Sequence, residues 1–549
     1  MIRRLWIVAI ACACVAGCRG AGTPTGLPQA PGATSAVSRA GGATPDTYIN
    51  ELPEPPVVKS VHGVAQVSLI ADTNPATGLP TFVYEGMQAT APTIEIEPGD
   101  TIEVDITDDL PAQGGMVSDM NLHFHGLTVS PRGNSDDVLD RLAKPGQELH
   151  YVVHVPKNQS PGLYWYHPHV HGETSYQVGE GGMSGAIVVD GLEKHIPVLA
   201  KMTQRLIIVR STGIGINAPP TGDDMDDMSD MASSGSSMSG MSSMSGMSSM
   251  GGESADPDGS NKTPCSQKSA DHLTTTLNGA YRPIITISPG EKQFFRVINA
   301  TGHKTLSLNI SGEDVSVVAI DGFAYDTYPG NPTTKKQLNV IIPPAARAEF
   351  VVTGQAKRAT FSSFCYNTGP NGDPDRYIFL AGVVPPKHKE AGYYGNAALT
   401  VGEPLVPNSY NTSLPPPAQK RVVVFSEEQK PHFYINGKSF KMSDPPMFVV
   451  HTGTVEEWTI HNVTQEIHDF HIHQIHFLVE ALDGVKLQHP YWADSVIVPH
   501  RKTVGKHAIP GTATFLMDFR DPIIRGEFLF HCHILDHEDQ GMMAKIEAI

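Results

Sequence analysis

The sequence predicts an all-β protein built from three sandwich domains. Short runs of β-branched residues, bounded by glycine and proline, follow one another along most of the chain, and no long stretch has the period of a helix. This pattern is typical of antiparallel β-sandwiches. The length of 549 residues agrees with three or four domains of about 150 residues each. The runs are Thr93–Thr107, His150–Val155, Ala186–Val189, Arg205–Val209, Pro283–Ser288 and Arg421–Phe425.

An internal repeat sets the number of domains at three. Each copy starts with a glycine, continues as a strand of alternating character, and has Asp or Asn nine residues after the glycine. The copies are GDTIEVDITD, GEKQFFRVIN and GTVEEWTIHN, which start at Gly99, Gly290 and Gly453. We therefore expect three related sandwiches. Their expected ranges are 56–195, 196–390 and 391–549.

Residues 1–18 have the features of an export signal. Arg3 and Arg4 precede the apolar stretch Leu5–Ala16, which is too short to span a bilayer. The sequence Val15-Ala16-Gly17-Cys18 resembles the lipobox of bacterial lipoproteins, in which Cys18 carries the lipid. Ordinary cleavage that discards Cys18 is the alternative, and the arginine pair also fits twin-arginine export. Either way we expect a protein of the periplasm or cell envelope, anchored by lipid if the lipobox is used.

Residues 19–55 are rich in Gly, Ala, Pro, Ser and Thr and are expected to form a flexible tether. The rest of the chain has a globular composition, with 40% hydrophobic and 17% charged residues. A net charge of −18 makes nucleic acid an unfavourable partner, because its binding depends on basic patches. Apart from a lipid anchor, no contact with a membrane is expected, since no other segment is apolar enough to cross one.

The six cysteines divide into two groups. Cys12 and Cys14 leave with the leader, and Cys18 belongs to the lipobox. In an oxidising compartment Cys265 and Cys365 can form a disulfide, or they can remain two buried thiols. The last cysteine, at position 532, lies between two histidines and is considered with them below.

An insertion in the second domain is unusually rich in methionine. Residues 222–258 contain no Leu, Ile, Val or aromatic residue, so they cannot bury a core and we expect them to be mobile. Thioethers are soft ligands that suit Cu(I), and aspartates alternate with them in the first part. Recruitment of Cu(I) is the favoured interpretation, and a linker without a role is the alternative. The methionines are Met225, Met228, Met231, Met238, Met241, Met244, Met247 and Met250.

Four histidine motifs predict metal binding. In a strand, residues i and i+2 point to the same face, so a His-x-His sequence presents two imidazoles side by side. One such motif alone would be read as two partly exposed strand residues, but four in one chain indicate metal sites. The motifs are His123-Phe124-His125, His167-Pro168-His169, His468-Asp469-Phe470-His471-Ile472-His473 and His531-Cys532-His533.

The last motif indicates which metal is bound. A thiolate, two imidazoles and a weak axial methionine form the ligand set of a blue-copper electron-transfer site. Cys532, His537 and Met542 lie on one segment, and His468 supplies the second imidazole. A structural zinc site would require paired cysteines, which are missing here. Eight imidazoles then remain for further copper, and two of them flank the cysteine.

In order and spacing, the four motifs resemble those of the multicopper oxidases, and the similarity extends from about residue 60 onward. This resemblance implies three cupredoxin domains and four copper ions per chain. It assigns type 1 copper to His468, Cys532, His537 and Met542. Type 2 copper is assigned to His123 and His471. The type 3 pair is assigned to His125, His167, His169, His473, His531 and His533.

The resemblance also implies an activity. Single electrons from a reductant pass through Cys532 to a trinuclear cluster, where O2 is reduced to water. Because this reduction consumes protons, we expect carboxylates near the cluster to relay them. Glu538 matches the family position for such a residue, and Asp136 is a weaker match, with Asp137 as the alternative. His171 and His476 lie outside the ligand pattern, so we expect supporting or structural roles for them.

Several reductants are compatible with this sequence. The methionine-rich insertion resembles that of copper-efflux oxidases, which favours a cuprous oxidase in copper tolerance with laccase-like activity towards phenols. In the best-known relatives, however, the insertion lies in the third domain. The alternatives are a laccase acting on aromatic donors and a periplasmic protein that sequesters copper without catalysis. A copper nitrite reductase is disfavoured, since it would leave the eight further histidines unexplained.

Overall fold

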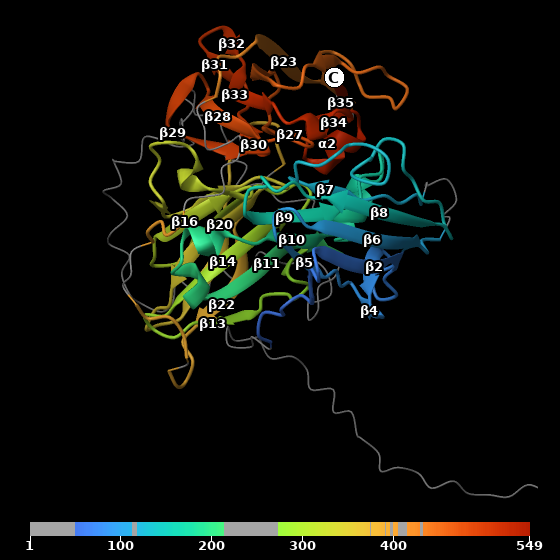
Figure 1. The fold of residues 1–549 in the computed structure, drawn as a ribbon. Coiled ribbons are helices and arrows are strands. Elements are labelled where there is room, and N and C mark those ends of the chain that lie inside the picture. Colours follow the sequence, from blue (N-terminus) through green and yellow to red (C-terminus); the bar gives the residue numbers. More distant parts are fainter. Residues whose placement is uncertain are drawn as a thin grey trace, which may run out of the picture. The chain divides into compact units, whose positions relative to one another are not determined.

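The computed structural model describes residues 50–111, 118–213, 273–373, 375–389, 391–395, 399–403, 414–428 and 432–549. All of them belong to one compact unit, Tyr48–Ile549. The described chain is almost entirely β-structure, arranged as three pairs of sheets (Figure 1). The predicted all-β fold is therefore confirmed. None of the described helices is long and apolar enough to cross a bilayer.

The first sandwich pairs two five-stranded sheets, in the orders β4-β3-β2-β6-β8 and β1-β5-β10-β9-β7. The strands of the former are β2 (Val64–Thr73), β3 (Pro80–Tyr84), β4 (Met87–Gln88), β6 (Thr101–Asp108) and β8 (Glu148–His154). Those of the latter are β1 (Val57–Lys59), β5 (Thr93–Ile96), β7 (His123–His125), β9 (Gly162–His167) and β10 (Gly185–Val189).

The second sandwich has one sheet in the order β12-β11-β14-β20-β16-β17, with β18 beside β16, and another in the order β13-β22-β21-β15-β19. The first sheet contains β11 (Thr203–Thr212), β12 (Thr274–Leu277), β14 (Lys292–Ala300), β16 (Val315–Ile320), β17 (Phe323–Ala324), β18 (Lys335–Gln337) and β20 (Arg347–Thr353). The second contains β13 (Ile284–Thr286), β15 (Leu306–Ile310), β19 (Val340–Ile342), β21 (Ala359–Phe364) and β22 (Ile378–Val384).

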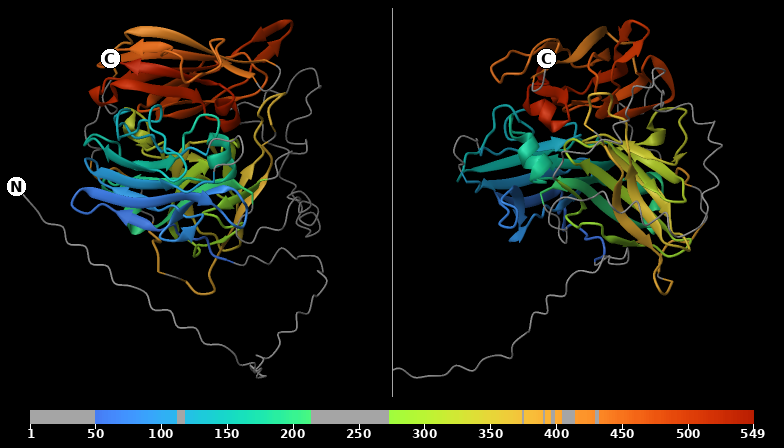
Figure 2. Two further views of the ribbon diagram at one scale, coloured as in Figure 1. Left: turned by 90° about the vertical axis from the view of Figure 1, so that its right-hand side faces the viewer. Right: turned by 180° about the vertical axis from the view of Figure 1, so that it is seen from behind.

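The third sandwich has sheets in the orders β24-β23-β26-β33-β28-β29 and β25-β35-β34-β27-β30, and Figure 2 shows it from two further sides in orange and red. The six-stranded sheet contains β23 (Gln419–Glu428), β24 (His432–Ile435), β26 (Thr454–Asn462), β28 (Phe477–Leu482), β29 (Val485–Ala493) and β33 (Gly511–Phe519). The other contains β25 (Phe448–Val450), β27 (His468–Ile472), β30 (Ser495–Val498), β34 (Gly526–Cys532) and β35 (Met543–Ala548), and β31 (Lys502–Val504) and β32 (His507–Ile509) form a hairpin.

Helices are short and lie between the strands. The α-helices are α1 (Leu192–His195) and α2 (Leu535–Asp539), and η1 (Ser175–Glu180) is a π-helix. The 3₁₀ turns are η2 (Leu199–Lys201), η6 (Tyr325–Thr327) and η8 (Pro522–Ile524).

The internal repeat marks the same position in each sandwich. Strands β6, β14 and β26 each lie between a parallel neighbour (β2, β11 or β23) and an antiparallel one (β8, β20 or β33). The glycine before each strand has a positive φ, of 101° at Gly99, 80° at Gly290 and 86° at Gly453. The Asp or Asn side chain at the other end accepts a hydrogen bond from the amide two residues later. The repeat thus encodes a turn, a central strand and a second turn.

Two expectations about the strands were wrong. The run Thr93–Thr107 is not one strand, because the turn at Pro98 and Gly99 divides it into β5 and β6, which belong to different sheets. The sandwiches are also not purely antiparallel, since β2–β6, β11–β14 and β23–β26 are parallel pairs. Each of these parallel pairs joins the first long strand of a sandwich to its repeat strand, and periodicity alone gives no sign of direction.

The expected tether ends earlier than residue 55. Leu52 is 5% exposed and packs in the core of the second sandwich, and its amide donates a hydrogen bond to the Ile284 carbonyl. Glu54 forms an ion pair with Arg205 at 2.8 Å. Residues 51–54 are therefore docked on the second sandwich. The rest of the tether and the leader lie outside the described residues.

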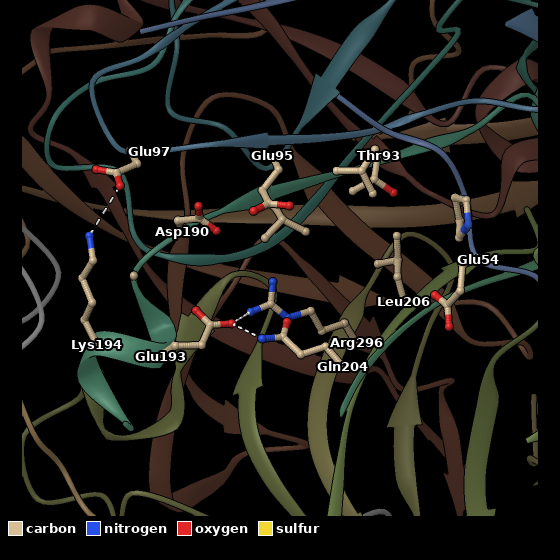
Figure 3. A pocket seen from close by; sticks show the side chains of 14 residues that line it. Glu54, Thr93, Glu95, Glu97, Asp190, Glu193, Lys194, Gln204, Leu206 and Arg296 are labelled. Atoms are coloured by element: carbon tan, nitrogen blue, oxygen red, sulfur yellow. Dashed lines mark hydrogen bonds and ion pairs between the residues drawn. The ribbon is translucent and has the colours of Figure 1, made fainter. Parts of the chain in front are cut away.

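A cavity of about 410 Å³ adjoins this docked segment, between β5 and β10 on one side and β11 and β14 on the other (Figure 3). Several carboxylates line it, and cations already pair with some of them: Lys194 lies 3.6 Å from Glu97, and Arg296 binds Glu193. No histidine or cysteine lines this cavity.

Each sandwich encloses its own apolar core. A smaller cluster joins them: Trp165 of the first sandwich packs with Ile298 of the second and with Leu535 of α2. This packing holds β9, β14 and the segment after β34 together, and two of the histidine motifs lie at the ends of β9 and β34.

Candidate metal centre

Two antiparallel strand pairs bring the four histidine motifs together in twos. In the first sandwich β7 pairs with β9, so that His123 lies opposite His167. In the third sandwich β27 pairs with β34, so that His471 lies opposite His531. The turn residue Gly126, with φ of 84°, ends β7 directly after the first motif. The first and third sandwiches therefore each present one compact set of four imidazoles.

The two sets meet at the contact between the first and third sandwiches. The rings of His123 and His473 stack with centroids 3.8 Å apart, and those of His125 and His471 stack at 4.0 Å. All eight imidazoles are at least 98% buried. The eight are His123, His125, His167, His169, His471, His473, His531 and His533.

Within this cluster the nitrogens gather in threes. His125, His167 and His533 form one group, and His169, His473 and His531 form another, each with nitrogens that lie within 4.8 Å of one another. A third group joins His123, His125 and His471. The groups draw members from both sandwiches, so the folded chain is needed to form them.

The hydrogen bonds of these imidazoles leave the inner nitrogens open. Nδ1 of His167 bonds to the Pro168 carbonyl at 2.7 Å, and Nδ1 of His471 bonds to the Asp494 carbonyl at 2.8 Å. Their Nε2 atoms are buried and have no hydrogen-bond partner among the described residues. A buried nitrogen without a partner is costly unless a metal ion binds it. This observation, together with the donor set, fits copper ions held by the cluster.

Burial keeps six of the eight imidazoles in the protonation state that metals require. It lowers the pKa of His125, His167, His471, His473 and His533 well below the ordinary value. For His169 the pKa falls to about 3. Neutral imidazole is the form that ligates a metal, so the site is prepared for cations at physiological pH.

A second centre is formed by His468, Cys532 and His537. The Cys532 sulfur lies 3.6 Å from Nδ1 of His468 and 3.7 Å from Nδ1 of His537. Cys532 is a free, fully buried cysteine, and burial raises the pKa of its thiol well above the usual range. Since the thiolate is the ligand form, a bound cation must stabilise it. Met542 is buried in the same core, and its carbonyl accepts a hydrogen bond from the Cys532 amide.

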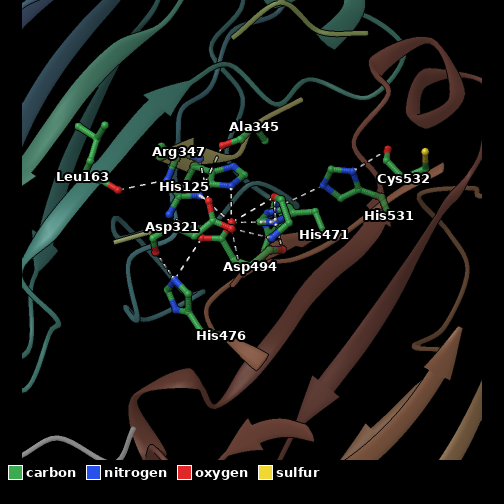
Figure 4. A network of polar contacts seen from close by, with 12 residues as sticks. His125, Leu163, Asp321, Ala345, Arg347, His471, His476, Asp494, His531 and Cys532 are labelled. Carbon is green, nitrogen blue, oxygen red and sulfur yellow. Dashed lines mark hydrogen bonds and ion pairs between the residues drawn. The ribbon is translucent and has the colours of Figure 1, made fainter. Parts of the chain in front are cut away.

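The two centres are joined through the backbone. His531, Cys532 and His533 are consecutive: the cysteine belongs to the thiol centre, and each histidine belongs to one of the two type 3 candidate groups. Figure 4 shows His531 and Cys532 side by side on β34. This connection is the shortest covalent path between the centres.

Two of the three candidate carboxylates reach the cluster. Asp136 is buried and lies 3.0 Å from Nδ1 of His123. Glu538 is buried and lies 3.0 Å from Nδ1 of His531 and 3.4 Å from Nε2 of His169. Asp137 turns away and accepts hydrogen bonds from the Gly133 and Asp140 amides.

Further side chains, marked by no motif, contact the candidate ligands directly or through one neighbouring residue. Asp494 lies 3.2 Å from Nε2 of His125, and Arg347 forms an ion pair with that aspartate. Trp165 stacks on His167 at 4.1 Å, and Phe433 stacks on His537 at 4.1 Å. Trp165 lies two residues before a motif and could have been suspected. The others are distant in sequence from the ligands that they touch.

The remaining histidines lie outside the groups. His171 packs against Phe440, with ring centroids 4.9 Å apart. His476 bonds to Asp494 and to the Asp321 carbonyl, each at 3.1 Å. Three expected features lie outside the described residues: the methionine-rich insertion, Cys18, and Cys265 of the predicted disulfide with Cys365. These stay predictions.

Sequence profiles of the multicopper oxidase family match residues 67–194, 234–381 and 412–548, which together make up most of the chain. The chain belongs to the multicopper oxidase family. It is therefore an oxidoreductase, and the alternatives of a copper-sequestering protein and a nitrite reductase are not supported.

Individual relatives of this multicopper oxidase agree with that assignment. It is 25% identical over 484 residues to the multicopper oxidase Mco of Staphylococcus haemolyticus, covering 85% of this chain and 83% of the relative. It is 22% identical over 422 residues to the laccase of Bacillus subtilis, covering 72% of each chain. Its fold is similar to that of a multicopper oxidase from Campylobacter jejuni, described as a metallo-oxidase, with a TM-score of 0.65, 21% identity and coverage of 91% and 95%.

Proposed function

We propose that this multicopper oxidase takes single electrons from Cu(I), and also from phenols, and uses them to reduce O2 to water. Type 1 copper would be held by His468, Cys532, His537 and Met542. Type 2 copper would be held by His123 and His471. The type 3 pair would be held by His125, His167, His169, His473, His531 and His533. The observation that carries the proposal is the junction at Cys532, where one residue of the thiol centre lies between two members of the eight-imidazole cluster.

The overall reaction balances for this donor. Four Cu(I) ions each lose one electron, and O2 with four electrons and four protons becomes two molecules of water. Bound copper supplies the reversible one-electron redox chemistry that protein side chains lack. The chain itself must position the donor, carry the electron between centres, exclude water from the cluster and deliver protons.

Electrons are taken up at His537. It is 7% exposed, whereas His468 and Cys532 are completely buried, so a donor can approach only its edge of the centre. Phe433 covers one face of its ring, and a Glu466 oxygen lies 3.5 Å from Nε2. The electron then crosses the Cys532 backbone to the adjacent histidines.

Protons are delivered by carboxylates next to the cluster. Glu538 is ionised at neutral pH, because the imidazoles of His531 and His169 outweigh the effect of burial and bring its pKa to about 2. Both oxygens face cluster histidines, so a proton taken up by Glu538 arrives beside the site of O2 reduction. Asp136, which bonds His123, is placed to serve the opposite side of the cluster.

Cu(I) is the favoured donor because of the methionine-rich insertion, residues 222–258, whose thioethers suit this ion. The lipobox at Cys18 and the export signal favour a role outside the cytoplasm, with the protein anchored to the cell envelope and acting in copper tolerance. A laccase role on aromatic donors is the second candidate, which the similarity to the Bacillus subtilis laccase supports.

An oxygen electrode separates the two candidates. The wild-type enzyme and a variant lacking residues 222–258 are each supplied with Cu(I) and, separately, with a phenolic dye. If the insertion delivers Cu(I), the deletion slows oxidation of Cu(I) more than oxidation of the dye. Equal losses, or no loss, would favour the laccase role.

A further inference from the structure

The second sandwich contributes no candidate copper ligand among its described residues, yet one of its side chains reaches Asp494, which contacts the cluster. Arg347, the first residue of β20, is completely buried. Its Nη1 and Nη2 donate to the two oxygens of Asp494 at 2.6 and 2.7 Å, the two-pronged geometry that a guanidinium allows (Figure 4). Its Nε donates to the Leu163 carbonyl of β9 at 3.1 Å. Arg347 therefore ties all three sandwiches together at one point.

Asp494 passes this restraint to the imidazoles. Its Oδ1 lies 3.2 Å from Nε2 of His125, a candidate ligand in the first sandwich. Its carbonyl accepts a hydrogen bond of 2.8 Å from Nδ1 of His471, a candidate ligand in the third. Because the Nε2 proton of His125 is directed at a carboxylate, its Nδ1 is left as the ligand atom, and Nδ1 is the buried nitrogen without a partner. One aspartate thus fixes the tautomer of one ligand and the ring orientation of another.

The surroundings of this pair are closely packed. A Cβ on Gly126, directly after His125, would lie 2.5 Å from Nη2 of Arg347 and 2.7 Å from Oδ2 of Asp494. The ring of Tyr164 lies beneath the guanidinium, 5.6 Å from its carbon atom. The positions of both charged groups are therefore set by close packing as well as by hydrogen bonds.

The energetics also favour a positioning role over a purely stabilising one. A buried ion pair pays a desolvation penalty that can exceed its attraction, and apolar residues of similar volume often give equal stability. Apolar residues in place of this pair could not form a directed hydrogen bond to an imidazole, as the Asp494 side chain does with His125. We infer that Arg347 is a positioning residue that, through Asp494, holds His125 and His471 in the geometry needed to bind copper in the cluster. This inference rests on the proposed four-copper function.

The test compares three variants. Arg347→Met removes both the charge and the two-pronged hydrogen bonding to Asp494, while Arg347→Lys keeps the charge but loses the two-pronged geometry. Arg296→Met is the matched control, because Arg296 is a buried arginine of the same sheet that pairs with Glu193 and Glu349 and contacts no candidate ligand. The readouts are copper per chain after dialysis against a chelator, the type 2 copper signal in electron paramagnetic resonance, the visible thiolate–copper band, and the melting temperature of the copper-free protein.

If Arg347 positions the ligands, Arg347→Met retains the thiolate band but loses cluster copper, with affinity reduced roughly 10- to 100-fold. Arg347→Lys falls between this variant and the wild type, and its type 2 signal is altered. Arg296→Met lowers the melting temperature and keeps its full copper content. The inference is overturned if Arg347→Met and Arg347→Lys keep full copper and an unchanged type 2 signal, whatever their melting temperatures.

The lysine variant keeps the test decisive if the methionine variant does not fold. In that case, loss of cluster copper from folded Arg347→Lys supports the inference, and full retention refutes it. Failure of the proposed function is visible separately, because wild-type protein would then bind fewer than four copper ions.

Discussion

Replacing Glu538 with glutamine should separate electron uptake from O2 reduction. Glu538 lies in α2, is completely buried, and approaches His531 at 3.0 Å and His169 at 3.4 Å. Glutamine has nearly the same volume and keeps a hydrogen-bond acceptor, but it cannot take up or release a proton. The perturbation is therefore chemical rather than steric.

The expected effect of Glu538→Gln on stability and on turnover follows from the surroundings of the carboxylate. Despite burial, the neighbouring imidazoles of His531 and His169 lower the pKa of Glu538 to about 2, so its carboxylate is ionised at neutral pH. The amide keeps only a neutral hydrogen bond, so we expect a loss of about 1–2 kcal/mol in the stability of the site. The loss of proton transfer is larger in kinetic terms, about 10²- to 10⁴-fold in turnover.

The assay compares two rates, that of electron uptake at the thiol centre and that of oxygen consumption. Under anaerobic conditions, bleaching of the thiolate–copper band by a reductant reports electron uptake, and it should stay close to the wild-type rate because the Glu538 side chain faces His531 and His169 of the cluster. Oxygen consumption should fall by about 100-fold or more. Glu527→Gln, on the exposed side of β34, is the control and should change neither rate. The reasoning is refuted if Glu538→Gln consumes oxygen at nearly the wild-type rate, or if both rates fall equally.

Three further predictions concern single positions. Gly126→Ala should cost about 2–4 kcal/mol of stability, measured by thermal unfolding, because its Cβ would lie 2.5 Å from the buried Arg347 guanidinium and its φ is 84°. In the control Gly133→Ala, the new Cβ meets no neighbouring atom, so we expect a cost of about 1 kcal/mol. Equal costs for the two variants would contradict this prediction. Cys532→Ser should abolish the visible thiolate–copper band yet retain cluster copper by elemental analysis; loss of all copper would count against two separate centres. Hydrogen bonds to Asp326 and to the Glu403 carbonyl raise the pKa of His195 despite burial. The stabilising effect of His195 is therefore present below pH 6.5 and is lost as the pH rises through the folded-state pKa. His195→Gln should lower the melting temperature more at pH 5.5 than at pH 8.5, and the opposite order would disprove this.

Local pattern was sufficient to find the candidate ligands and the repeat. The His-x-His spacing depends on the two-residue period of a strand, which holds wherever the strand lies in the fold. The repeat glycines depend on positive φ, and the terminal Asp or Asn on a turn two residues long, as Gly453 and Asn462 illustrate. These features depend only on residues close together in the chain, so they can be recognised from a single sequence.

Features that depend on contact between sandwiches were not predictable in this way. Arg347 and Asp494 are 147 residues apart, and neither lies in a motif. Their meeting depends on how three separately folded cores pack together. The pairing direction of strands was missed for a similar reason, because hydrophobic alternation is the same in parallel and antiparallel strands. Asp136 and Asp137 are adjacent in the sequence, and only the folded loop directs Asp136 to His123.

The ratio of Cu(I) oxidised to O2 consumed is the most direct test of the proposed reaction. Purified, copper-loaded enzyme is given a known amount of Cu(I) in an oxygen electrode, with catalase added in a parallel run to reveal peroxide. We expect four Cu(I) oxidised per O2 and no change with catalase. A ratio of two with oxygen returned by catalase, or no enzyme-dependent oxygen consumption, would contradict a thiol centre that feeds a cluster able to reduce O2 completely to water.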